Sequence, residues 1–179
     1  MLAHFRVSAR VLALVLAIPI TVSPVLWAAR ASNYSAEITA LLADAKSEAG
    51  LLKQDTEDME SFTRSNSSWQ SYAITINKVK QHVNELGDLS SKLNNARSGG
   101  SPWQQDAIDR INPLLKEVAT NVEATINQLN QHQSLVHSSH YKEYVQATHE
   151  QATNVASLIS DYVEYGKSKD KMEALAKEQ

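Results

Sequence analysis

Residues 69–97 have the sequence WQSYAITINKVKQHVNELGDLSSKLNNAR, in which apolar side chains recur every three or four positions. The recurring positions are Trp69, Tyr72, Ile76, Val79, Val83, Leu86, Ser90 and Leu93. This spacing places them on one face of an α-helix, at the a and d positions of a heptad repeat, with Ser90 as a single polar break. A helix with such a seam is stable only when other helices cover it.

Three further segments carry helical seams. The first contains Ile38, Leu41, Leu42, Ala45, Ala49, Leu52, Met59 and Phe62. The third contains Ile108, Ile111, Leu115, Val118, Val122, Thr125 and Leu129, and the fourth contains Val145, Ala152, Val155, Leu158, Ile159 and Tyr162. Short connections at 63–66, 98–100 and 131–138 require neighbouring helices to run antiparallel. We therefore predict an all-α, up-down-up-down four-helix bundle over residues 32–166, followed by a charged helical tail at 167–179 that frays.

A short phrase marks the predicted helix starts, because SSWQ at 67–70 returns as SPWQ at 101–104. A serine at the N-cap accepts a hydrogen bond from a free backbone N–H, and a glutamine three residues later completes a capping box. The four predicted starts are Ser32-Asn33-Tyr34, Ser67-Ser68-Trp69, Ser101-Pro102-Trp103 and Ser139-His140-Tyr141. We expect Trp69 and Trp103 to close the ends of the core, with a stacking role as the alternative.

Several residues disturb the helical pattern. Pro113 lies inside the third segment, where a missing N–H and a steric clash predict a kink near 109–113. Gly50, Gly87 and Gly166 are interior glycines that either permit close helix contact or are simply tolerated.

Four polar residues fall in or beside the predicted core: Asn77, Ser90, Asn112 and Thr125. Polar groups in a seam specify helix register or line a pocket, and register is the favoured interpretation.

The N-terminus has the pattern of an export signal. Arg6 and Arg10 precede an uncharged, largely apolar run over 11–29, and Ala29-Arg30-Ala31 provides a small-residue cleavage site. We expect residues 1–31 to form a signal helix that is removed, leaving a periplasmic or secreted protein. The alternative is an uncleaved inner-membrane anchor over 11–29, because that run has about the 20 residues that span a bilayer.

The charge balance argues against nucleic acid as a partner. Residues 1–31 hold three of the 17 basic side chains and none of the 20 acidic ones, so cleavage would leave a net charge of −6. A nucleic-acid binder needs a basic face instead. The acidic group Asp55, Glu57, Asp58 and Glu60 is interpreted as a solvated helix face rather than a cation site. The chain has no cysteine, which excludes disulfides and thiolate chemistry.

Histidines are the remaining candidates for a metal or haem site. His132, His137, His140 and His149 cluster in sequence, with Glu143 among them, but their spacing matches no zinc motif. Solvated loop histidines are the favoured interpretation. Met59 and His149 could ligate haem between the first and last helices, although Met59 on the apolar stripe is better explained as core.

The segment SPWQQDAIDRINPLLKEVATNVEATINQLN, at 101–130, resembles a family of exported bacterial helical-bundle proteins with no known activity. The resemblance implies an exported bundle and transfers no functional residue, and the architecture is also similar to periplasmic sensory bundles. No catalytic motif is present, and we assign no catalytic, cofactor-binding or metal-ligating residue.

Two functions follow from these observations. The first is a non-enzymatic exported bundle with a protein-binding, envelope-binding or structural role. The alternative is a periplasmic bundle that binds a small molecule, a metal or haem, with a pocket near Pro113 or at the histidine-rich end. The regular heptads also leave a homodimer open.

Overall fold

The computed structural model describes residues 24–65 and 67–178, with side chains from residue 35 onward. Four long helices account for nearly all of these residues. They are α1 (Pro24–Phe62), α2 (Trp69–Ala96), α3 (Pro102–Gln131) and α4 (Ser139–Lys177), with one-turn helices η1 (Arg97–Gly99) and η2 (Gln133–Leu135) in two of the connections. Most of the predicted signal segment therefore lies outside the described residues.

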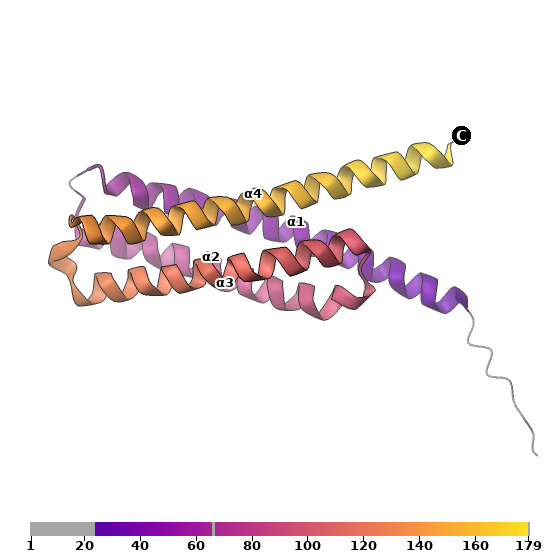
Figure 1. The fold of residues 1–179 in the computed structure, drawn as a ribbon, viewed down its shortest axis with the longest axis horizontal. Helices are drawn as coiled ribbons and strands as arrows, with labels where there is room; N and C mark the ends of the chain where they lie inside the picture. The colour runs from indigo at the N-terminus through magenta and orange to yellow at the C-terminus, as the bar shows by residue number, and fades with distance from the viewer. Residues whose placement is uncertain (1–23, 66, 179) are drawn as a thin grey trace, which may run out of the picture.

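The helices form the predicted four-helix bundle. Each runs antiparallel to the next along the chain, and α1 packs against both α2 and α4 while α3 packs against the same two helices (Figure 1). α1 and α3 are thus diagonal partners, and the four seams face a single interior. The described residues form no β-strand.

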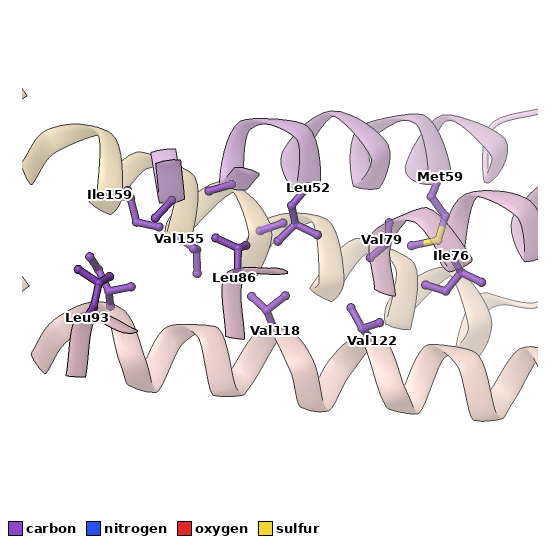
Figure 2. Close-up of a cluster of buried hydrophobic side chains, with 14 of the residues drawn as sticks. Leu52, Met59, Ile76, Val79, Leu86, Leu93, Val118, Val122, Val155 and Ile159 are labelled. Carbon is purple, nitrogen blue, oxygen red and sulfur yellow. The ribbon is translucent and has the colours of Figure 1, made fainter. Parts of the chain in front are cut away.

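The predicted seams supply the core. Figure 2 shows side chains from all four helices meeting along the bundle axis, including Leu52, Leu86, Val118 and Val155. In α2 the buried seam residues are Tyr72, Ile76, Val79, Leu86 and Leu93. Complete burial of each large aliphatic side chain stabilises the fold by about 1.5–3 kcal/mol, which is how the heptad pattern becomes a folded structure. Trp69 departs from the prediction, because it lies on the exposed side of the first turn of α2.

The helix starts agree with the serine prediction only in part. Ser101 caps α3, its backbone N donates to Oε1 of Gln104 over 2.9 Å, and Pro102 occupies the first turn. α2 begins one residue later than expected, with Ser68 at the N-cap, so the predicted box between Ser67 and Gln70 is wrong. Ser67 and Ser68 are adjacent, and either could serve as the N-cap by the local rule. The structure places Ser68 at the N-cap.

The other two starts also shift. α4 is capped by Ser138 rather than Ser139, and the Ser138 hydroxyl accepts a 3.2 Å hydrogen bond from the backbone N of Tyr141. α1 already begins at Pro24, so Ser32 lies inside the helix and does not start it. The small and apolar residues before Ser32 favour helix, and nothing in that stretch breaks it.

Pro113 and the interior glycines, which the sequence predicts to disturb the helices, affect the structure in different ways. α3 continues as one helix through Pro113, whose ring is on the exposed side. A Cβ added at Gly50 or Gly87 would meet no neighbouring atom within 4 Å, so these glycines are tolerated rather than required for contact. Gly166 differs, because a Cβ there would lie 2.7 Å from Cη2 of Trp103. Of the three interior glycines, only Gly166 allows close helix contact.

Candidate functional site

A groove between α3 and α4 forms a hollow on the surface of the described part of the chain. It encloses about 550 Å³ and is lined by Trp103, Asp106 and Arg110 from α3 and by Leu158, Asp161, Tyr162 and Tyr165 from α4. The α3 residues are spaced by three and four, as are the α4 residues, so each set lies on one helix face. Two adjacent antiparallel helices therefore present a mixed aromatic and charged wall.

A second hollow of about 610 Å³ continues the first along the same two helices and shares Arg110, Leu158 and Asp161 with it. Its other lining residues are Asp109, Pro113, Leu114, Glu117, Asn154 and Ser157. We call the two hollows together the α3/α4 groove. Its position beside Pro113 matches the pocket expected there from the sequence.

Gly166 shapes the end of the groove. Its missing side chain lets the Trp103 ring lie against α4, where Trp103 also meets the ring of Tyr165 edge to face with centroids 5.6 Å apart. Trp103 is half-buried, whereas Tyr165 is more than half exposed. The expectation that Trp103 closes the core is thus only partly met, because one side of the ring pair remains accessible.

A polar network joins α3 to α4 across the groove. The Tyr162 hydroxyl donates a short hydrogen bond to Asp106, and Nη1 of Arg110 donates to the same hydroxyl over 3.2 Å. The Arg110 guanidinium also lies 5.9 Å from the centroid of the Tyr162 ring, within cation–π range. Desolvation, and secondarily the hydrogen bond to Asp106, raise the pKa of Tyr162 above its ordinary value. The phenol therefore stays protonated and fixes the two charged side chains.

The groove carries more acid than base. Asp109 forms a two-bond pair with Arg97 at 2.7 and 2.6 Å, and this guanidinium holds the pKa of Asp109 below its usual value. Asp161 lines both hollows and also a third one beside Lys46 and Lys53 of α1, and it forms no ion pair with a described side chain. Arg110 is the basic side chain of the lining, against Asp106, Asp109, Glu117 and Asp161. The excess of carboxylates favours a cationic occupant.

The histidines proposed as metal ligands do not form a cluster with one another. His132, His137 and His140 are exposed around η2 and the start of α4, and Nδ1 of His140 is 3.8 Å from Glu143. Over the described part of the chain, no group of three or more histidine or acidic side chains is arranged to hold a metal ion.

The proposed haem ligands occupy different environments. Met59 is fully buried in the hydrophobic core, as its position on the apolar stripe suggested. His149 is half-buried, with Nδ1 3.3 Å from the Thr56 hydroxyl and Nε2 3.8 Å from a Glu60 oxygen. These contacts give His149 a place in the packing between α1 and α4.

Sequence reasoning missed a histidine that joins α1 to α2. Nδ1 of His82 lies 2.5 Å from Oε1 of Glu48, and Nε2 lies 3.2 Å from Oδ2 of Asp55. Asp55 belongs to the acidic group interpreted as solvated, but it is half-buried. The only available signal was the seven-residue spacing of Glu48 and Asp55, which places both on one face of α1.

Gln104 is a second missed contact. Its side chain is fully buried, and beyond the capping box its amide nitrogen donates to the Ser35 carbonyl at 2.8 Å and to the Thr39 hydroxyl at 3.0 Å. The Ser35 hydroxyl in turn donates to Oε1 of Gln104 over 2.9 Å. One glutamine thus caps α3 and ties it to its diagonal partner α1.

The polar seam residues make contacts between helices, as the register interpretation requires. The hydroxyls of Thr125 and Thr148 are 3.2 Å apart between α3 and α4. Ser90 donates to Asn112 over 2.6 Å between α2 and α3. Asn77 is exposed, so its assignment to the core was wrong. Because each bonded pair meets at only one helix register, these contacts disfavour slippage.

No family model, no curated protein and no solved structure matches this chain. Among the described residues, no helix combines the length and apolar character needed to cross a membrane.

Proposed function

We propose that this protein is a non-enzymatic helical bundle of the cell envelope that binds a protein partner through the α3/α4 groove. The observation that carries the proposal is the exposed combination of aromatic rings and unpaired carboxylate at Tyr165, Tyr162 and Asp161. Aromatic side chains in a shallow depression are typical anchors of protein interfaces, because they bury a large area at a small entropic cost.

Charge complementarity specifies the occupant. Asp161 and Glu117 have no ion-pair partner among the described side chains, and Arg110 is already engaged with Tyr162. A partner segment that carries lysine or arginine beside apolar residues would pair with the free carboxylates while covering Leu114 and Leu158. A neutral or acidic segment would leave these carboxylates desolvated and unpaired, which is unfavourable.

Two features support binding rather than catalysis. Three titratable groups of the groove are already engaged, because the Tyr162 hydroxyl is hydrogen-bonded to both Asp106 and Arg110. The groove is also open to solvent along its length, whereas catalytic electrostatics work best in a site that excludes water. The envelope location rests on the basic and apolar pattern of residues 1–31.

Site-specific photocrosslinking in the cells that produce the protein tests this function. The photoreactive residue p-benzoylphenylalanine is placed at Leu114 or Asn154 in the groove, and at Ile74, which is exposed on α2, as the matched control. We expect a discrete adduct with a second protein at both groove positions and none at Ile74.

Charge variants of the same protein make the result specific. Asp161→Lys should abolish the adduct, whereas Asp161→Glu should retain it, because only the first reverses the charge. Equal adducts at Ile74, or adducts that Asp161→Lys does not affect, would contradict binding in the groove.

A second candidate function is the binding of a small organic cation, favoured by the unpaired Asp161 carboxylate beside the Tyr162 and Tyr165 rings. Choline and its neutral isostere 3,3-dimethylbutanol form a matched pair of probes. This function requires a rise in melting temperature with choline alone, and loss of that rise in Asp161→Asn. Equal shifts with both probes, or none, would argue against it.

A further inference from the structure

α4 continues beyond the helix that covers it. Trp103, at the start of α3, packs on Gly166, and residues 167–177 of α4 extend past this contact at the free end of the bundle (Figure 1, yellow). We call residues 165–177 the α4 extension. Three large apolar side chains are exposed on it: Tyr165 at 53%, Met172 at 72% and Leu175 at 53%. A soluble helix rarely exposes such a series unless another surface covers it.

The exposed side chains are ordered around the helix. At about 100° per residue, Tyr165, Met172 and Ala176 fall within about 40° of one another, so they form one stripe. Lys169 and Glu173 lie together on one flank of that stripe and form an ion pair of 2.8 Å. Leu175 lies on the opposite flank. Lys171 lies about 40° beyond Leu175, so one edge of the stripe carries the Lys169–Glu173 ion pair and the other carries Leu175 and Lys171.

The charged flanks of two α4 extensions complement each other when the two helices run antiparallel. A two-fold axis perpendicular to the helices, near residue 171, places like flanks against each other. Lys169 of each copy then faces Glu173 of the other, Met172 lies beside its equivalent, and Tyr165 covers Ala176. A parallel pair would instead set the charged flank against the flank of Leu175 and Lys171, where Lys169 would have no acidic partner.

We propose that two copies of this chain associate antiparallel through the α4 extension. Twelve residue steps of helix overlap over about 18 Å, so the interface is small and the dimer forms reversibly with protein concentration. Tyr165 belongs both to the extension and to the α3/α4 groove. Dimerisation covers one end of the groove, but it does not depend on whether the groove binds a partner.

Sedimentation velocity over a concentration series, on the protein as purified from producing cells, tests the association. We expect a monomer–dimer equilibrium whose dissociation constant rises about tenfold in Lys169→Glu, because two ion pairs become repulsive contacts. The double variant Lys169→Glu/Glu173→Lys restores complementarity and should recover the original constant. Met172→Asp should leave only monomer, with unchanged helix content by circular dichroism because the residue is exposed.

The absence of cysteine allows a direct test of direction. Met172→Cys should form a disulfide with its equivalent under mild oxidation, and Tyr165→Cys should cross-link to Ala176→Cys in a mixture but not to itself. Self-cross-linking of Tyr165→Cys would show a parallel pair and overturn the antiparallel arrangement. A monomer at every concentration, or a dimer indifferent to all these substitutions, would overturn the interface itself.

Discussion

The two ends of the bundle both contain aromatic pairs, yet they use them differently. At the closed end, where α1 ends and α2 and α4 begin, Phe62, Tyr72 and Tyr141 meet edge to face with centroids 5.4 and 5.2 Å apart. Tyr72 and Tyr141 are completely buried there. At the open end, Trp103 and Tyr165 make a similar contact at 5.6 Å, but more than half of Tyr165 is exposed.

The difference comes from where the helices end. At the closed end the rings come from three helices and pack against one another, so Tyr72 and Tyr141 become core. At the open end α2 and α3 turn at residues 97–101, while α1 and α4 extend beyond them (Figure 1). The same residue type is therefore part of the core at one end and exposed to solvent at the other.

The largest expected contrast is between Tyr72→Ala and Tyr165→Ala. Tyr72→Ala removes a buried ring with two aromatic neighbours and should lower the free energy of unfolding by about 3–5 kcal/mol. Tyr165→Ala removes an exposed ring and should change it by only about 0.5 kcal/mol or less. Urea denaturation followed by circular dichroism measures both, and similar losses would show that the two ends are equivalent.

Two glycine substitutions compare a glycine with free space around it, Gly50, with Gly166 at the open end, which packs against Trp103. Gly50→Ala should stabilise the protein by about 1 kcal/mol, because helix propensity rises and no atom obstructs the added Cβ. Gly166→Ala gains the same propensity but pushes against the Trp103 ring, and overpacking costs about 1–3 kcal/mol. Thermal unfolding should thus rank Gly50→Ala above Gly166→Ala. Equal stabilisation would mean that Trp103 is free to move aside.

A further small effect concerns a buried hydroxyl at the closed end. The Tyr141 hydroxyl has no hydrogen-bond partner among the described atoms, and burial, followed by the nearby Tyr72, raises the pKa of this phenol. Tyr141→Phe should therefore be neutral or stabilising by about 1 kcal/mol at neutral pH. Tyr162→Phe, which removes a bonded hydroxyl, should be destabilising instead.

The pH dependence of the same variant has a definite sign. Because the folded pKa of Tyr141 lies above the unfolded value of about 10, only the unfolded state loses this proton as the pH rises past that value. The contribution of the protonated Tyr141 hydroxyl to the free energy of unfolding is fully present below a pH of about 10, and it falls as the pH rises above that value. Tyr141→Phe should flatten this alkaline decline in denaturation curves, and an unchanged slope would contradict the assigned cause.

The heptad spacing was sufficient to predict the architecture. Ile76, Leu86 and Val118 are buried as their positions required, because a 3.5-residue period selects one helix face whatever covers it. The capping box at Ser101 was also predictable, since its two partners are only three residues apart. The starts predicted at Ser32, Ser67 and Ser139 were wrong, and at the last two an adjacent serine satisfies the same local rule.

Tertiary structure alone decided what surrounds each face. His82 contacts Glu48 and Asp55 because α2 lies against α1 at a particular rotation, and no local pattern encodes that angle. Trp69 and Trp103 lie in nearly identical sequence motifs at the starts of their helices, yet only Trp103 packs against Gly166. The groove and the exposed α4 extension exist because α3 starts where α4 has not yet ended. Periodicity along a helix is a local property, whereas the rotation and relative lengths of packed helices depend on the whole bundle.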